Sequence, residues 1–132
     1  MKVIVRPVTK QDKGIVFSTW LKGNYFGCKY FNEMDQDLYF KEYGQYIQDL
    51  LDKPGTKVDV AVFEDAPTVD VGYIVYNDQT LYWAYTKRQY RKQGIFNILI
   101  QNMDFVRFTG STPVGLAIGK KKQLEFNPIG DK

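Results

Sequence analysis

The chain has 132 residues, of which 44% are hydrophobic, 25% are charged and 16% are aromatic, and its formal net charge is +3. This composition is typical of globular proteins and excludes disordered and fibrous classes, and the length predicts one domain over residues 1–132. Histidine is absent, which excludes Ser/His and Cys/His nucleophile pairs, histidine bases and nearly all the common zinc sites, so we expect no metal.

The start of the chain and its apolar runs indicate where the protein works. No apolar run approaches the roughly 20 residues needed to span a bilayer, and MKVIVRPVTK lacks the apolar stretch and cleavage site of a secretory signal. The single Cys28 cannot form an internal disulfide, which agrees with a reducing compartment. We therefore expect a cytoplasmic protein without a membrane segment.

The first half of the chain predicts a strand followed by two helices. Val3–Val8 reads as a strand, and Thr9 with Asp12 resembles a capping box that starts a helix ending at Lys22, where Gly23 offers a stop. An aromatic loop over 24–34 follows. From Asp35 apolar residues recur every three or four positions, which predicts a second helix that ends at Lys53-Pro54-Gly55.

The centre of the chain predicts three strands that pair antiparallel in sequence order, because their connections are short. In KVDVAVFE alternate valines share one face, and in VDVGYIVY the alternation puts Val69, Val71, Tyr73 and Val75 on one face. Residues 80–86 form the third strand of this meander. Its alternation places Tyr82 on the same face as Ala84 and Thr86.

The last third predicts a crossover unit. Ile95, Ile98, Leu99, Met103 and Val106 form a helical stripe, and Pro113–Ile118 reads as a strand parallel to the third strand of the meander. A basic run, Lys120–Lys122, and a short tail follow. The predicted fold is therefore α/β (α+β), in the order β-α-α-β-β-β-α-β, with a mixed sheet and helices on both faces.

The stretch YRKQGIF, residues 90–96, lies where the central strand turns into the crossover helix. The first backbone N–H groups of a helix lack internal partners and carry partial positive charge, so such a junction is suited to phosphate. Gly94 lets the backbone approach a ligand, and Arg91 with Lys92 adds formal charge. This combination is typical of a pyrophosphate site, although a solvated loop with a permissive glycine is the alternative.

The order of elements and the R-x-x-G-x string over Arg91–Ile95 resemble the GCN5-related N-acetyltransferase (GNAT) superfamily. More narrowly, VRPVTKQDKGIVFSTWLKG, VGYIVYNDQTLYWAYTKRQYRKQGI and a tail with FNP are similar to small phage-encoded GNAT-like proteins. The resemblance implies an acetyltransferase that uses acetyl-coenzyme A. It also implies cofactor contacts by the pantetheine-binding strand and the pyrophosphate loop, which are Ala84, Tyr85, Thr86, Arg91, Lys92, Gln93, Gly94, Ile95 and Phe96.

Acetyl transfer to an amine needs a group that removes a proton and a donor for the developing oxyanion. Tyr82 and Glu64 are the catalytic candidates, with Asp78 as a further carboxylate, and each has a structural alternative as a sheet or turn residue. The resemblance implies that the first two helices border the acceptor, which points to Tyr25, Phe26 and Tyr30. Without an activating partner besides Lys29, Cys28 is expected to be inert.

The sequence departs from the family pattern in two ways. Phe96 stands where the motif has a small residue, so its ring either crowds the cofactor or points into the core. The chain also ends soon after the predicted parallel strand, which predicts a truncated fold. An alternative is therefore a catalytically weak or inactive GNAT-like protein that binds a host protein. Contact with nucleic acid ranks last, and self-association as a homodimer at the exposed end of the sheet is left open.

Overall fold

The computed structural model describes residues 2–27, 33–101, 103–105, 107–108 and 125–126, and these contain one mixed six-stranded sheet. Its strands lie in sequence order as β1 Val3–Pro7, β2 Lys57–Phe63, β3 Ala66–Asn77, β4 Thr80–Thr86, β5 Arg107–Phe108 and β6 Glu125–Phe126. Strands β1 to β4 pair antiparallel, whereas β5 runs parallel to both β4 and β6. The predicted antiparallel meander is confirmed.

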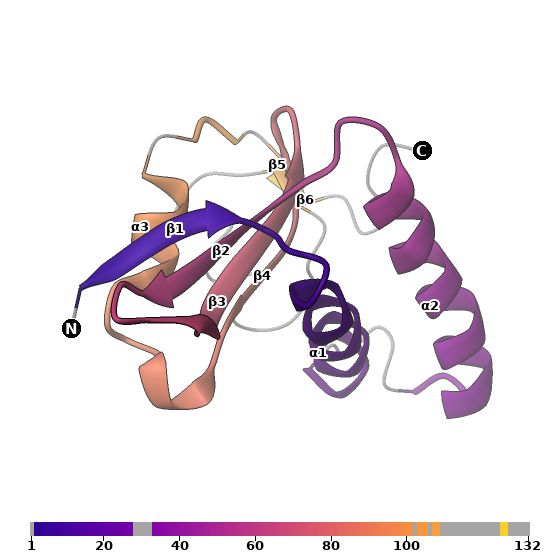
Figure 1. The fold of residues 1–132 in the computed structure, drawn as a ribbon. Coiled ribbons are helices and arrows are strands. Elements are labelled where there is room, and N and C mark those ends of the chain that lie inside the picture. The colour runs from indigo at the N-terminus through magenta and orange to yellow at the C-terminus, as the bar shows by residue number, and fades with distance from the viewer. Residues whose placement is uncertain (1, 28–32, 102, 106, 109–124, 127–132) are drawn as a thin grey trace.

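Helices cover both faces of the sheet (Figure 1). Helices α1, Asp12–Gly27, and α2, Gln36–Asp52, pack on one face, where Val16, Trp20 and Ile47 join strand residues in a first core cluster. Helix α3, Ile95–Ile100, covers the other face, where Ile95 and Leu99 join a second cluster. The predicted α+β class and the predicted element order are confirmed, with β6 as an additional strand. None of the helices in the described residues is long and apolar enough to cross a membrane.

The first turns of α1 and α2 show why these helices begin where they do. Asp35 caps α2 by accepting a 3.0 Å hydrogen bond from the Leu38 amide. Before α1, the Asp12 carboxylate accepts a 2.7 Å hydrogen bond from the Thr9 amide, which is the carboxylate half of the predicted capping box. Because each bond satisfies an amide that has no partner inside the helix, both sequence signals select their helix starts correctly.

The predicted end of the first helix is wrong, because α1 continues through Gly23 to Gly27. A Cβ atom at Gly23 would lie 3.1 Å from Cζ2 of the Trp83 ring on β4. The glycine therefore lets the helix approach the sheet and does not end it. This packing also brings Trp20 over Trp83, with ring centroids 6.3 Å apart and planes at 13°.

Two bulges overturn the faces predicted from strict alternation. Against β2, Gly72 pairs with Ala61 and Asp70 with Val62, so Val71 is an extra residue and is buried in the second cluster, not beside Tyr73.

The second bulge is in β4. Against β3, Trp83 pairs with Val75 and Leu81 with Tyr76, so Tyr82 is the extra residue. Tyr82 and Trp83 both face the first cluster, whereas Ala84 packs against the second. Since a bulge shifts the side-chain period by one, Tyr82 and Ala84 lie on opposite faces.

The chain after α3 also departs from the prediction. The helix ends at Ile100, and Met103 and Phe105 belong to an irregular segment that still packs against the second cluster. Their apolar character therefore reflects core contacts and not a longer helix. The described parallel partner of β4 is Arg107–Phe108. The predicted strand Pro113–Ile118 and the Lys120–Lys122 run lie outside the described residues.

Candidate functional site

The segment between β4 and α3, residues 87–94, is named here the β4–α3 loop. It contains a short 3-10 turn, Arg88–Tyr90, and two residues with left-handed backbone, Lys92 at φ 64° and Gly94 at φ 80°. A Cβ atom at Gly94 would meet no atom within 4 Å. The space beside the Gly94 backbone is therefore open, and the glycine is required by its backbone angle and not by crowding within the protein.

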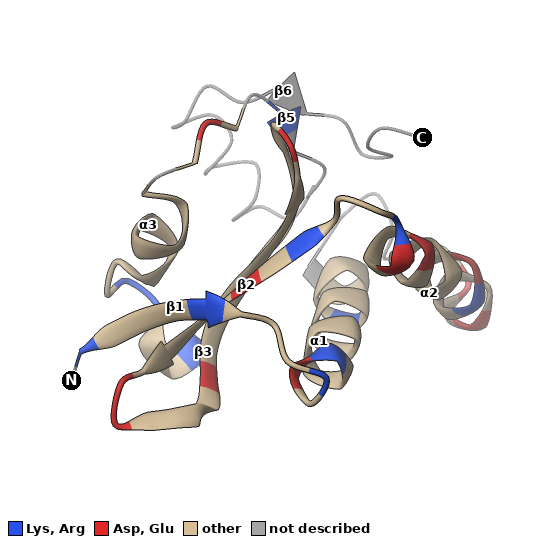
Figure 2. Cartoon of the chain, turned by 45° about the horizontal axis from the view of Figure 1, so that its top comes forward, with Lys and Arg blue, Asp and Glu red and all other residues tan. Residues whose placement is uncertain are grey.

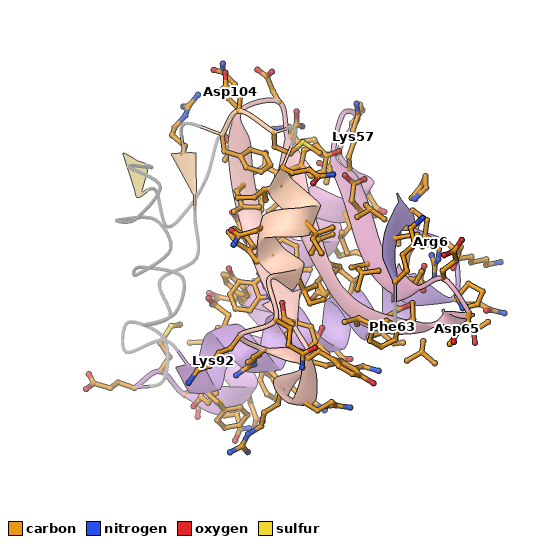
Figure 3. The ribbon with its side chains drawn as sticks, turned by 90° about the vertical axis from the view of Figure 1, so that its left-hand side faces the viewer. Arg6, Lys57, Phe63, Asp65, Lys92 and Asp104 are labelled. Atoms are coloured by element: carbon orange, nitrogen blue, oxygen red, sulfur yellow. The ribbon has the colours of Figure 1, made fainter. Side chains whose placement is uncertain are left out.

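The side chains of the β4–α3 loop tie it to the sheet. The Nε atom of Arg91 donates a 3.0 Å hydrogen bond to the carbonyl oxygen of Thr86, at the end of β4. The Tyr90 ring contacts Phe63 of β2 edge-on, with centroids 5.2 Å apart. Figure 3 accordingly shows Lys92 and Phe63 toward the same end of the sheet, opposite Lys57 and Asp104. The loop is thus held at the end of the sheet where β4 finishes.

The charge of the β4–α3 loop has one sign. Six consecutive residues of the loop, 87–92, contain no carboxylate and four cations, which are Lys87, Arg88, Arg91 and Lys92. By contrast, α2 has acidic side chains along its length (Figure 2), which are Asp37, Glu42, Asp49 and Asp52. Arg88, Arg91 and Lys92 are exposed. The loop therefore offers formal positive charge to an anion from solvent.

Backbone amides at the start of α3 complete the site. The first intrahelical hydrogen bond runs from the Ile98 amide to the Gly94 carbonyl oxygen over 3.0 Å, so the amides of Ile95, Phe96 and Asn97 precede it. The Phe96 ring is half-buried and packs against the second cluster. Of the two alternatives for this residue, the ring points into the core, which leaves its amide beside Gly94.

The C-terminal half of β4 borders this loop. Ala84, Tyr85 and Thr86 are half-buried and pair with β3 on one side. On the other side, the described pairing with β5 involves only Thr80 and Leu81, at the start of β4. The three residues that the resemblance assigns to the cofactor arm, Ala84 to Thr86, thus lie between this described pairing and the β4–α3 loop.

The candidate catalytic residues lie on separate elements. Tyr82 is 1% exposed and belongs to the first core cluster. Glu64 is exposed in the β2–β3 turn, where its amide donates to the Lys2 carbonyl oxygen, and Asp78 is exposed in the β3–β4 turn at the other end of β3. The two carboxylates are thus at opposite ends of the sheet. The assignment of proton transfer to Tyr82 or Glu64 stays a prediction.

Two of the candidate acceptor residues are in the last turn of α1. Tyr25 is buried, donates a 3.0 Å hydrogen bond to the Met34 carbonyl oxygen and contacts the Tyr39 ring with centroids 4.7 Å apart, so it joins α1 to α2. Phe26 is 64% exposed and can contact a molecule from solvent. Tyr30 lies outside the described residues. The acceptor assignment of all three residues stays a prediction.

The sequence does not predict a polar cluster that lies beside the Val71 bulge of β3. Arg6 of β1 forms a bidentate ion pair with Asp12, at 2.6 and 3.2 Å, and its Nη2 lies 3.3 Å from Oδ1 of Asp70 on β3. The side chains of Asp12 and Asp70 are each 6% exposed. The sequence has a signal only for the bulge beside Asp70, since a glycine inside a strand, here Gly72, often marks a bulge or a close backbone contact.

Comparisons with known structures identify the fold. The chain resembles a candidate acetyl transferase from Pyrococcus furiosus with a TM-score of 0.62 and 11% identity, over 95% of this chain and 79% of that one. It resembles apo-form YjaB from Escherichia coli with a TM-score of 0.63 and 15% identity, over 92% and 82% of the two chains. No protein-family model and no curated protein matches the sequence.

A third structure with this fold carries the name of the superfamily. It is the "GCN5-related N-acetyltransferase: aminotransferase, class-II" of Rhodopseudomonas palustris, with a TM-score of 0.52 and 13% identity, over 76% of this chain and 62% of that one. The protein therefore has a GNAT-like fold. At these identities the likeness establishes the fold alone, and activity is a separate question.

Proposed function

We propose that the protein is an N-acetyltransferase that takes the acetyl group of acetyl-coenzyme A and transfers it to an amine. The observation that carries this proposal is Gly94, whose left-handed backbone opens onto free space in a basic loop of a GNAT-like fold. Phosphate fits this loop because backbone amides and cationic side chains bind it together.

The proposed binding mode uses protein backbone to bind two parts of the cofactor, its pyrophosphate and its pantetheine arm. The β4–α3 loop binds the pyrophosphate through the amides next to Gly94, with Arg91 and Lys92 as cations. The backbone of Ala84, Tyr85 and Thr86 pairs with the amides of the pantetheine arm, in the manner of an added strand. Acetyl-coenzyme A supplies the activated acyl group as a thioester.

The proposed reaction is direct attack. The neutral amine of the acceptor forms a bond to the thioester carbonyl carbon, the carbon–sulfur bond breaks, and the amine loses a proton while the thiolate of coenzyme A leaves. Positioning alone can supply about 7–11 kcal/mol of the barrier reduction, so a weak base is sufficient. We assign the proton transfer to Tyr82, with Glu64 as the carboxylate alternative, and the acceptor wall to Tyr25, Phe26 and Tyr30.

The test of this proposal is thermal unfolding with and without acetyl-coenzyme A. A ligand at a hundredfold excess over its dissociation constant stabilises a protein by about 2.7 kcal/mol. The wild-type protein is expected to show such a shift. Absence of any shift at millimolar ligand contradicts acetyl-coenzyme A binding and with it the proposed activity.

The matched variants are Gly94→Asp and Gly94→Asn. Both residues tolerate left-handed backbone and have nearly the same shape, but only aspartate places a negative charge beside the pyrophosphate. We expect the shift to disappear in Gly94→Asp and to persist, in part, in Gly94→Asn. Equal shifts in the two variants would show that the ligand binds elsewhere.

An enzymatic assay distinguishes the proposed acetyltransferase from the alternative, a GNAT-like protein that only binds. An acetylation assay with a panel of amines, read by release of coenzyme A thiol, is expected to show activity. A protein that binds acetyl-coenzyme A without acetylating any amine supports the alternative, a GNAT-like protein that acts by binding another protein.

A further inference from the structure

The Arg6–Asp12–Asp70 cluster connects three elements, β1, α1 and β3. Arg6 on β1 binds Asp12 of α1 in a bidentate pair, lies 3.3 Å from Asp70 of β3 and donates to the Pro67 carbonyl oxygen over 3.1 Å. Thr9 donates its hydroxyl to Asp12 over 2.8 Å. One guanidinium thus holds two buried carboxylates and the first residues of β3.

The residues that follow Asp70 support both ends of the β4–α3 loop. At the start of the loop, the Lys87 amide donates a 2.9 Å hydrogen bond to the carbonyl oxygen of Val71, the extra residue of the bulge. At its end, the Ile95 side chain packs on Gly72, where an added Cβ would lie 3.3 Å from Ile95 Cγ2. A displacement of residues 70–72 therefore moves both ends of the loop.

We propose that the Arg6–Asp12–Asp70 cluster positions the β4–α3 loop, by holding Val71 and Gly72 in the place where both ends of the loop rest. Asp70 is a positioning residue in this inference and does not contact the ligand. The inference deepens the proposed function and rests on it, since the loop is the proposed cofactor site.

The charges around Asp70 make the arrangement sensitive to protons. Asp12 from α1, Arg6 from β1 and Lys87 at the start of the loop are the ionisable groups that act on Asp70. Burial and the neighbouring Asp12 carboxylate raise the pKa of Asp70 to about 6, against the opposing effects of Arg6 and Lys87. When Asp70 ionises, two buried carboxylates repel each other beside one guanidinium, which loosens residues 70–72.

The first test needs no ligand. Amide hydrogen exchange is measured by NMR at about pH 5 and pH 7.5, on either side of the pH at which Asp70 ionises. The exchange rates are corrected for the intrinsic pH dependence of exchange in an unfolded chain. The protection of the Lys87 amide is expected to fall about fivefold more than that of core strand amides, which corresponds to weak coupling between sites. If Lys87 follows the core amides, the change is only global stability and the inference is wrong.

Two variants sharpen this measurement. Asp70→Asn keeps the shape of the neutral carboxyl and is expected to abolish the additional pH dependence at Lys87. Asp65→Asn removes an exposed carboxylate from the β2–β3 turn and is expected to retain the wild-type pattern. Persistence of the effect in Asp70→Asn overturns the inference. The wild-type comparison of Lys87 with the core amides is decisive by itself, so the inference can be tested even if a variant fails to fold.

The second test links the cluster to the ligand. Coenzyme A affinity is measured by calorimetry for the wild type and Asp70→Asn at the same two pH values, so that titration of the ligand itself cancels. The ratio of wild-type to variant affinity is expected to fall about fivefold as pH rises, and a constant ratio contradicts the coupling. If neither protein binds coenzyme A, the proposed function fails, while the exchange result still decides whether the cluster positions the loop.

Discussion

The Nε atom of Arg91 donates a 3.0 Å hydrogen bond to the carbonyl oxygen of Thr86, which joins the middle of the β4–α3 loop to the last residue of β4. Within the described residues no other hydrogen bond is made by this guanidinium. Its two terminal nitrogens can therefore bind an anion while Nε keeps the loop in place, which is a division of roles that lysine cannot reproduce.

Arg91→Lys tests this division of roles. The variant keeps the charge but loses either the Thr86 contact or the phosphate contact. A hydrogen bond to a charged group contributes about 1.5–3 kcal/mol, so we expect coenzyme A to bind at least about tenfold more weakly. The free energy of unfolding is expected to change by less than about 0.5 kcal/mol, because Arg91 is exposed. Arg88→Lys is the control, and an equal loss in both variants contradicts a special role for Arg91.

Gly72→Ala tests the contact between β3, β4 and α3. The added methyl group would lie 2.6 Å from the Tyr85 carbonyl oxygen, which is backbone and cannot rotate away. We expect a loss of about 1–3 kcal/mol in the free energy of unfolding, typical of overpacking, measured by urea denaturation. Gly14→Ala in α1, where nothing lies within 4 Å, is the control and is expected to gain up to about 1 kcal/mol. Equal effects would show that Gly72 is not crowded.

Tyr73 provides a test of the layer between α1 and the sheet. Its buried hydroxyl donates to the Val16 carbonyl oxygen over 3.1 Å and lies 2.7 Å from the Thr19 hydroxyl, and burial raises its pKa, so the group stays neutral. Tyr73→Phe is expected to cost about 1 kcal/mol of unfolding free energy. A double-mutant cycle with Thr19→Ala measures the coupling between the two hydroxyls, and strictly additive effects would contradict it.

The sequence was sufficient to predict the features that depend on local pattern. Apolar residues alternate along the sequence of the three central strands, and Asp35 and Thr9 with Asp12 mark helix starts, so the sequence predicts these strands and helix starts to within a few residues. The same pattern predicts the position of Gly94 between β4 and the helix that follows, where it directly precedes α3. Its left-handed backbone, 80° in φ, agrees with the turn chemistry expected of glycine.

Features that depend on distant contacts could not be predicted in this way. Gly23 reads as a helix stop until Trp83, 60 residues later in the chain, is seen to pack on it. The bulge at Tyr82 has no local signature, so strict alternation predicts the wrong face for this residue. The partner of Asp70 is Arg6, which is 64 residues away, and a pairing at this distance leaves no periodic trace in one sequence.

The two buried carboxylates predict opposite pH effects on stability. Burial alone would raise the pKa of Asp12, but hydrogen bonds from Arg6 and Thr9 hold this pKa well below its usual range. Asp12 therefore stabilises the fold above its unfolded pKa of about 4, and this stabilisation is lost at lower pH. Asp70 has its pKa raised to about 6, so its stabilisation is complete at low pH and is lost as pH rises from about 4 to 6.

Asp70→Asn isolates the second of these effects. The asparagine cannot ionise, so the free energy of unfolding of the variant, relative to the wild type, is expected to increase between about pH 4.5 and pH 7.5, in the direction that linkage requires. Urea denaturation at several pH values measures this difference. Asp65→Asn, in the exposed β2–β3 turn, is expected to differ from the wild type by a constant amount. A pH-independent difference for Asp70→Asn would mean that Asp70 ionises with the same pKa in the folded and unfolded chains, and that Arg6 compensates fully for its burial.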